Sequence, residues 1–593
     1  LTGAFAGAGT GTRNTIHEVV TATIEDSMVT TTVNGDVAVT ANDTAEIWAW
    51  SGSISLAGAF GSQGQNAAVS IGASVARNEI GQFGITSDDH ELSTGDAVVY
   101  TAAAGSPSVD GLTSGTTYRV IAVDEDRIEL AATEDDATQR RPITLDATRI
   151  TGKHELTKGS KRIKFGGADV GRGLLRAAVV DSTVNAAGDV RVTTDFAADI
   201  SVFTLAGSAS AASNGTGGGL AASGAGADAE NTIRMAVESY VEDTNTADQS
   251  AYSITAGGAL FVSANDSTII NSAARGIALA FTGGSNTGVT LTVGVSLSRN
   301  IVENRLDASI RGVTATTTTG DVEVVAESVA KKLFELSTIG TNSVSVADLD
   351  NAATTDSDDP LTIGVDEKAD DETANAAIVQ KVKAQFEAKG HDLPEAADDL
   401  VLSRLAEGQA WSLLDKDSSR TWVIFLKDGK LEVSRATIDS LAAAASATFA
   451  GGEKGIALSG GGAGSRNVVM SRARAYVTES ILVSARDVVI RGVESSNITA
   501  SVLTISIAIG AGSTSGVSAS VGASIARNFI GYTEDEVRVP SAIHASSLNS
   551  DIKATGNLSL TASSLHIIDS HVFTGSAAVA GGLGDDGFSV ALS

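Results

Sequence analysis

The sequence predicts an all-β protein, a repetitive parallel β-solenoid (β-helix) with repeats of about 65 residues. Three observations predict this fold. A strand-like segment recurs along the chain, one asparagine closes each copy with three of the five gaps between 61 and 69 residues, and a Gly-Asp or Gly-Asn turn follows most copies. Two gaps between copies are longer than the rest. We therefore expect one small β module and one small α+β module to interrupt the repeats.

The recurring strand is clearest at residues 517–531, V-S-A-S-V-G-A-S-I-A-R-N-F-I-G, and returns at residues 67–81. Val517, Val521 and Ile525 alternate with serine and glycine, which is the period of two of a β-strand. Burying these three side chains would contribute roughly 5–9 kcal/mol, whereas ordering about nine backbone residues costs roughly 9–18 kcal/mol. The strand therefore needs ladder partners above and below it, and we expect its larger side chains to be buried. A string of β-sandwich domains of about 65 residues is the alternative to the solenoid.

The asparagine that closes each strand defines the spacing of the repeats. It occurs at Asn14, Asn78, Asn231, Asn300, Asn467 and Asn528. Gaps of 64, 69 and 61 residues set the period, and gaps of 153 and 167 residues each leave room for one inserted module. With glycine at the corners, each repeat holds about three β segments, which predicts two to three coils per repeat.

This spacing divides the chain into five parts. Residues 1–81, 171–340 and 451–593 are expected to form β-solenoid repeats. Residues 82–170 are expected to form the inserted β module, and residues 341–450 the inserted α+β module.

The first insertion predicts a hairpin over residues 116–131 and contains two similar segments, H-E-L-S-T-G at His90 and H-E-L-T-K-G at His154. Two His-Glu pairs suggest metal ligands. No spacing between them matches a known zinc pattern, so turn residues are the favoured interpretation.

The second insertion differs in composition. Residues 348–371 are acidic and are interpreted as a loop or linker, because they lack the glycine and final glutamate of an EF-hand calcium loop. Residues 372–389 have the apolar spacing of a helix, and a second helix is predicted for residues 394–408. A β meander should follow, with a hairpin turn at residues 428–429.

Composition excludes several classes of function. A net charge of −30 without a basic patch argues against nucleic-acid binding. The absence of cysteine fits export without disulfides. Residues 498–526 carry no charge and are long enough to span a membrane, but their alternation favours strands, so membrane insertion is not expected. Trp48 and Trp50 share one face of a strand, where filling the core is the favoured role.

One motif suggests a cofactor. G-G-L-G-D-D-G-F-S fits a calcium-binding nonapeptide, in which Gly581, Gly582, Gly584 and Asp586 would form the calcium site. Such sites need consecutive copies and this chain has one, so an ordinary glycine turn between two strands is the alternative. No catalytic constellation is recognisable, and an enzyme is not expected.

Long uncharged segments, such as residues 51–76, suggest a contact surface. The small outward side chains, Ser518 and Ser520 among them, are expected either to be covered within the chain or to form a surface for lateral homo-assembly.

The repeat pattern I/V-x-x-S-x-V-x-A-x-G-D-V-x-V-x-A, with R-N-x-I-G closing the glycine-rich strand, resembles giant repetitive surface adhesins of Gram-negative bacteria, of the filamentous-haemagglutinin-like and biofilm types. The first insertion resembles small β modules found in such proteins. The resemblance implies an extracellular or cell-surface location, a β-solenoid stalk, and attachment to a cell-surface or polysaccharide ligand. It also leads us to expect that the chain is a window from a longer protein. A self-assembling filament or sheath protein and a polysaccharide-processing β-helix enzyme are the alternatives.

Overall fold

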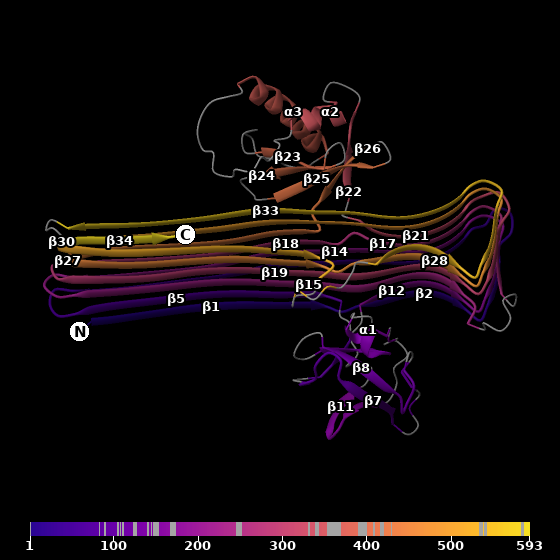
Figure 1. Ribbon diagram of the computed structural model, residues 1–593, viewed down its shortest axis with the longest axis horizontal. Coiled ribbons are helices and arrows are strands. Elements are labelled where there is room, and N and C mark those ends of the chain that lie inside the picture. The colour runs from indigo at the N-terminus through magenta and orange to yellow at the C-terminus, as the bar shows by residue number, and fades with distance from the viewer. Residues whose placement is uncertain are drawn as a thin grey trace.

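The computed structural model is all-β and dominated by large parallel sheets, as predicted, and is consistent with a β-solenoid (Figure 1). The structure describes residues 2–593 except for 82–83, 88–89, 104–105, 107, 110–111, 123–126, 139–141, 144, 146–152, 166–172, 245–251, 330–331, 339–342, 353–368, 390–399, 407–409, 416–419, 428–429, 533–535, 537, 539–541 and 583–585.

One circuit of the chain shows how the sheets arise. Strand β4 (Val37–Gly61) runs to a Gly/Ser turn, β5 (Asn66–Ile80) runs back, β12 (Leu174–Val180) continues it, and β13 (Thr183–Ala186) closes the far end. The next strand, β14 (Val190–Asn214), lies parallel to β4 in unbroken register. One repeat therefore makes one circuit, here called a coil. The prediction of two to three coils per repeat is wrong, because β4 alone is 25 residues long.

The coils stack into three ladders of parallel strands. The outgoing ladder consists of β4, β14, β17 (Leu260–Asp266) with β18 (Ile269–Gly284), β21 (Val322–Val329) with β27 (Ile438–Val469), β30 (Val488–Ile530) and β33 (Leu558–Gly582). The return ladder consists of β1 (Thr2–Ile16) with β2 (Val19–Glu25), β5 with β12, β15 (Gly219–Glu242), β19 (Thr287–Arg311), the second half of β27 with β28 (Arg472–Thr478), the second half of β30 with β31 (Ile543–Leu548), and β34 (Asp586–Leu592). The short third ladder consists of β3 (Met28–Thr30), β13, β16 (Ser253–Ala256), β20 (Thr314–Thr317), β29 (Ile481–Ser484) and β32 (Asp551–Ala554).

The asparagines that mark the repeats stack on one another inside the coils. The Asn78 amide donates to the Asn231 side-chain oxygen at 2.9 Å, and Asn300 donates to Asn467 at 2.7 Å. The same bond joins Asn14 to Asn78 and Asn467 to Asn528, both at 2.7 Å. This asparagine ladder satisfies buried amides that would otherwise destabilise the core, and it fixes the register of each coil on the next.

The coils are wide at the end that carries the third ladder and narrow toward the Gly/Ser turn (Figure 1). The wide half has an ordinary apolar core, with residues such as Val37, Leu175 and Val184 packed in one cluster. In the narrow half the two ladders are too close for such side chains. A Cβ atom on Gly72 would lie 2.3 Å from the carbonyl oxygen of Gly207 in the facing ladder, so only small residues fit between them.

The first insertion is a separate antiparallel sheet with its own core. Its elements are β6 (Ile85–Thr86), β7 (Ala97–Ala102), β8 (Thr117–Ala122), β9 (Arg127–Ala131), α1 (Glu134–Thr138), β10 (His154–Lys158) and β11 (Lys161–Phe165). Strands β8 and β9 pair antiparallel, which confirms the predicted hairpin. The module contacts the return ladder through Glu129, whose carboxylate lies 3.0 Å from the guanidinium of Arg305.

The second insertion packs a five-stranded antiparallel sheet against helices. Its elements are β22 (Lys332–Leu336), α2 (Val346–Ala352), α3 (Ala369–Ala388), β23 (Leu400–Ala406), β24 (Ala410–Asp415), β25 (Arg420–Lys427) and β26 (Lys430–Arg435). Because β22 pairs with β26, the described module extends from residue 332 to 435, and residues 438–450 belong to the outgoing ladder rather than to the insertion.

Three predictions for this module have different outcomes. Helix α3 confirms the helix predicted at residues 372–389, and the predicted meander is present, although its turn at residues 428–429 lies outside the described residues. The helix predicted at residues 394–408 is wrong, because Leu400–Ala406 is strand β23, paired with β24. Part of the supposed acidic loop is helix α2, which begins with a bond from the Ser345 amide to the Asp348 carboxylate; residues 353–368 lie outside the described residues.

Both insertions leave the stack in register. The first leaves after Ile80, which pairs with Ile233, and re-enters at Leu174, which pairs with Ala236. The second leaves after Val329, which pairs with Ser495, and re-enters at Ile438, which pairs with Ile498. Ser495 and Ile498 are also three residues apart in the next coil. Each module therefore stands in the place of two residues of an uninterrupted neighbouring strand.

Candidate binding surface

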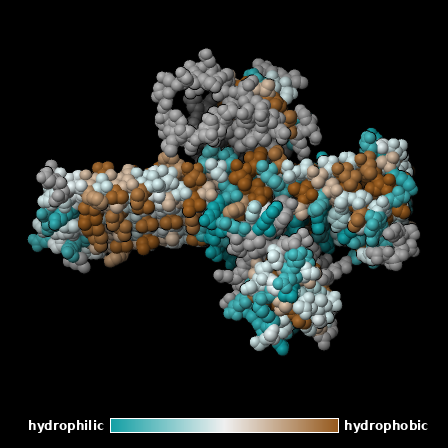
Figure 2. All heavy atoms as spheres, viewed as in Figure 1, coloured by the Kyte–Doolittle hydropathy of each residue, from teal (hydrophilic) through white to brown (hydrophobic). Residues whose placement is uncertain are grey.

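The narrow half of the stack turns its larger apolar side chains outward. In β4, Ser53 and Ser55 are buried, whereas Ile54 and Leu56 are 68% and 70% exposed. Figure 2 shows hydrophobic residues gathered over this part of the molecule. An apolar outer face of this extent is unusual on a soluble protein and typically marks a contact surface.

The predicted orientation of the recurring strand is therefore wrong. Ser518 and Ser520 are fully buried, whereas Val517, Val521 and Ile525 are 37%, 48% and 54% exposed. The proposed assembly surface on the Ser/Gly face does not exist, because that face points into the narrow interior. The close approach of the two ladders reserves the inside for small residues and leaves the outside to the large ones.

The narrow interior is held together by hydroxyl hydrogen bonds. Ser70 donates to the Ser55 hydroxyl at 2.8 Å, and Ser520 of the return ladder donates to the Ser506 hydroxyl at 2.9 Å. These bonds cross from one ladder to the other, so the hydroxyls that make them have partners that replace water. The buried hydroxyls of Ser53, Thr204 and Ser518 have no such partner among the described residues. The polar interior is thus a structural core, and it is the outer surface that remains for function.

Charged rows bound the apolar surface on the side of the wide half. On the return ladder, one row aligned by the strand register contains Arg13, Arg77, Glu230, Arg299, Arg466 and Arg527. Within this row Glu230 lies 3.5 Å from Arg77 and 3.2 Å from Arg299. On the outgoing ladder the apolar surface begins beyond Glu46 and its register partner Asp199, with Asp439 two positions further along the strands.

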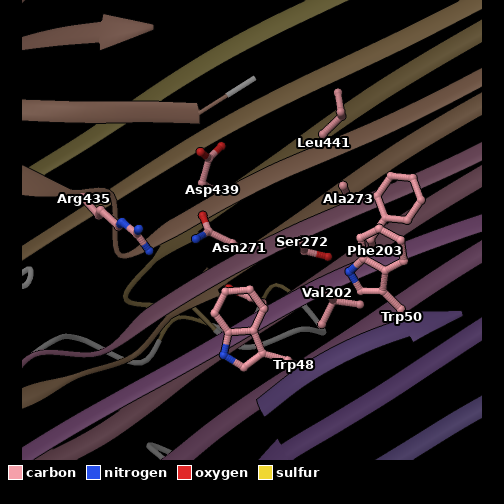
Figure 3. Close-up of a pocket in the computed structure, with 11 residues that line it drawn as sticks. Trp48, Trp50, Val202, Phe203, Asn271, Ser272, Ala273, Arg435, Asp439 and Leu441 are labelled. Atoms are coloured by element: carbon pink, nitrogen blue, oxygen red, sulfur yellow. The ribbon is translucent and has the colours of Figure 1, made fainter. Parts of the chain in front are cut away.

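A groove lies at this limit, where the second insertion rejoins the outgoing ladder (Figure 3). Its cavity volume is about 250 Å³. It is lined by Trp48, Trp50, Ser201, Val202, Phe203, Asn271, Ser272, Ala273, Arg435, Asp439 and Leu441. Four coils contribute to it, together with the last residue of β26, so the groove exists only when the module and the stack are both in place.

The two tryptophans of the groove are exposed, and Phe203 beside them is half-buried. Trp48 and Trp50 are 69% and 79% exposed, so the prediction that they fill the core is wrong. The Trp50 ring centroid lies 5.5 Å from that of Phe203, and the Trp48 indole nitrogen donates to the Glu46 carboxylate. Two tryptophans of one strand thus point outward beside the polar side chains of neighbouring coils.

Polar groups face these rings across the groove. Asn271 and Asp439 are register partners on adjacent strands, and Arg435 approaches from the module. The Arg435 guanidinium lies 3.6 Å from the Asp199 carboxylate, which holds it at the edge of the groove. The arrangement combines flat aromatic surface with an amide, a carboxylate and a guanidinium, which is the chemistry of a site for a polyhydroxylated ligand.

The structure describes three of the four residues of the predicted calcium site, which stays a prediction. Gly581 and Gly582 end β33, and Asp586 begins β34; Gly584 lies outside the described residues. Among the described residues no group of three or more His, Asp or Glu side chains could hold a metal ion.

The two His-Glu pairs also have local structural partners. The His90 ring accepts a hydrogen bond from the Leu92 amide at 2.9 Å, which agrees with a turn residue. His154 lies in β10, where its ring nitrogen is 2.9 Å from the Tyr100 hydroxyl. Both histidines are buried in the first insertion.

In comparisons with known proteins, no family model, curated protein or solved structure matches the chain. Within the described part of the chain, no helix has both the length and the apolar character needed to cross a membrane. The groove could not be found from sequence, since its lining comes from strands far apart in the chain. The outward pairing of Trp48 and Trp50 was its one local signal.

Proposed function

We propose that this chain is a segment of an extracellular β-solenoid stalk from a giant repetitive adhesin, and that the aromatic groove is one of its attachment sites. The observation that carries the proposal is the groove, with the exposed Trp48 and Trp50 and the half-buried Phe203 beside Asn271 and Asp439. A cell-surface or matrix polysaccharide is the ligand class that this surface fits.

The chemistry of a sugar explains the choice. A pyranose ring has a face of C–H groups that packs on the electron-rich face of an aromatic ring, and Trp50 and Phe203 offer such faces. Its hydroxyl groups both donate and accept hydrogen bonds. Asn271 can do both, Asp439 accepts and Arg435 donates, so a ring stacked on the tryptophans could have its hydroxyls satisfied.

The stalk part of the proposal is supported by the continuity of the stack. The asparagine ladder runs through the coils from Asn14 to Asn528, and neither insertion shifts the register. A stack of this kind can be lengthened by adding coils, because each coil contacts only its neighbours. It therefore suits a protein that holds binding sites away from a cell surface.

Screening the chain on an array of bacterial and mammalian glycans, followed by calorimetric titration of the strongest binder, tests the proposal. Trp50→Ala should weaken binding about tenfold, because a lost aromatic contact costs roughly 1–1.5 kcal/mol. Phe60→Ala is the matched control, since Phe60 is an exposed aromatic at the other end of the same strand. Equal binding by both variants, or no bound glycan, contradicts the proposal.

Electron microscopy of the purified chain tests the stalk separately. We expect flat particles with two bulges, corresponding to the coil stack and its insertions in Figure 1. Separate beads joined by linkers would contradict a continuous stack.

A further inference from the structure

We propose that the outer face of the outgoing ladder is the interface of a two-fold symmetric dimer of this chain, in which the two stacks run antiparallel. This inference goes beyond the stalk, and its tests involve no saccharide. Because the dimer would cover Trp50 and Phe203, which also line the groove, a second copy and a saccharide would compete for these side chains. The apolar face is defined by the outward residues of β4 from Trp50 to Phe60 and by their register partners on β14, β18, β27, β30 and β33.

Large and small side chains alternate from coil to coil in two central rows of this face. The first row reads Ile54, Gly207, Ile277, Ala445, Ile505, Gly575. The second row reads Leu56, Ala209, Leu279, Ala447, Ile507, Ala577. In both rows the large side chains lie on β4, β18 and β30, and the small ones lie on β14, β27 and β33. The strands with large side chains therefore form ridges, and the strands between them form grooves.

The geometry of parallel strands fixes the size of this pattern. Neighbouring strands are about 4.8 Å apart, so the ridges repeat about every 9.6 Å, wide enough to admit the side chains of a second ridge. Interdigitation of this kind is how apolar sheet faces pack against each other.

A two-fold axis parallel to the strands makes the face complementary to itself. Such an axis keeps each residue in its row and reverses the order of the six coils. Ile54 then faces Gly575 of the second copy, Ile277 faces its Ala445, and Ile505 faces its Gly207. Every ridge in the two central rows meets a groove. A two-fold axis along the stack would instead set ridge against ridge.

Two rows flank the central rows at the groove side and follow the same rule in part. The outer one reads Trp50, Phe203, Ala273, Leu441, Ser501, His571, and the inner one reads Gly52, Leu205, Arg275, Ala443, Leu503, Phe573. Under the same axis Phe203 faces Ser501, Ala273 faces Leu441 and Gly52 faces Phe573, so large meets small there, whereas Trp50 faces His571 and Leu205 faces Leu503. In the outermost apolar row Phe281 faces Phe449, an aromatic contact rather than a ridge in a groove.

The area is sufficient for a stable dimer. Six strands and ten residue steps give a face of about 29 Å by about 33 Å, on the order of 950 Å² per copy. Two copies would bury roughly 1,900 Å², above the roughly 1,600 Å² of a standard specific interface. Arg275 is the one charged side chain other than histidine in the face, and its guanidinium lies 5.5 Å from the Phe203 ring, over the neighbouring coil.

Analytical ultracentrifugation of a swap series tests the complementarity. Ala445→Ile alone places a ridge against Ile277 of the other copy, and Ile277→Ala alone leaves a void, so each should weaken dimerisation at least tenfold. The double variant exchanges ridge and groove and should restore the wild-type dissociation constant to within about threefold. A generally adhesive surface predicts the opposite for Ala445→Ile, namely tighter association, and that result would overturn the proposal.

Cysteine pairs test the antiparallel order, because the chain has no cysteine of its own. Ile54→Cys with Gly575→Cys puts the two thiols on the first and sixth coils, too far apart to join within one copy. Mild oxidation should give a covalent dimer of the double variant and none of either single variant. Cross-linking of Ile54→Cys alone would show a parallel arrangement and refute the antiparallel one. A chain that stays monomeric in solution but floats with phosphatidylcholine vesicles would refute the dimer itself.

Discussion

The Asn231 amide donates to the side-chain oxygen of Asn300 at 2.8 Å, while it accepts a bond of 2.9 Å from Asn78. Asn231 is fully buried and also donates to Ser272 at 3.0 Å. One residue therefore holds three coil segments in register. The contribution of such a residue depends on its neighbours, because each amide satisfies the next.

Asn231→Ala should destabilise the chain by roughly 2–3 kcal/mol, because it leaves the amides of Asn78 and Asn300 buried without one partner each. Asn14→Ala removes the first member of the same ladder, where one bond is lost at a part-buried position, and should cost about 1 kcal/mol. Urea unfolding of both variants measures the difference. Equal midpoints for the two variants would show that the ladder adds nothing to the packing of the coils.

Gly72→Val should prevent correct folding, because its Cβ would lie 2.3 Å from the Gly207 carbonyl oxygen. Gly224→Val is the matched control: it lies on the return ladder of the next coil, and nothing is within 4 Å of its Cβ position. We expect soluble, β-rich protein from the control and aggregated or misfolded protein from the Gly72 variant. Circular dichroism and gel filtration distinguish the two, and a folded Gly72→Val protein would mean that the ladders can move apart.

Glu129→Ala should loosen the first insertion from the stack. The Glu129–Arg305 pair is nearly buried, with both side chains below 15% exposed, and removing one partner of a buried pair costs about 3–5 kcal/mol. Arg305 keeps a second partner, Glu303, at 2.8 Å, which favours the lower end of that range. Limited proteolysis should release the module faster in this variant. Glu134→Ala, which breaks the exposed pair with Arg119, should leave the rate of release unchanged.

Asp43 makes stability depend on pH. Its burial in β4, together with the nearby negative charge of Glu18, raises the pKa of its carboxyl group to about 6. The folded protein thus binds this proton more tightly than the unfolded chain, so the contribution of Asp43 to stability is greatest below about pH 4 and is lost as pH rises through 6. Asp43→Asn should therefore be more stable than wild type at pH 7.5, by on the order of 2–3 kcal/mol, and equally stable at pH 4. Thermal melts at both values test this; an equal difference at the two values would exclude Asp43 as its source.

The strands, their period and their register were predictable from the sequence, since the recurring asparagines are the residues that pair across coils. The orientation of the narrow strands was not. The prediction assumed that the side chains of Val521 and Ile525 are buried in the core, as they would be if the two facing ladders lay at the usual distance of packed sheets. Gly72 and Gly276, whose Cβ positions lie against the backbone of the facing ladder, indicate that the interior has no room for larger side chains.

The second insertion shows a different limit of sequence-based prediction. Residues 400–406 lie in a segment that begins at Pro394 and whose alanines, leucines and glutamates favour a helix by local propensity, yet β23 pairs with β24 in the sheet of the module. Tertiary pairing overrides weak local preference. The groove and the ridge pattern could not be predicted from local sequence patterns, because they are made by residues that only the stacking of the coils brings together.

The place where each insertion joins the stack has a consequence for how such a chain can evolve. Because a whole module replaces only two residues, between positions that remain three residues apart in the neighbouring coil, genetic recombination at these points can add, remove or exchange a module without disturbing the strands on either side. A lineage can thus exchange the inserted modules while it conserves the scaffold that carries them.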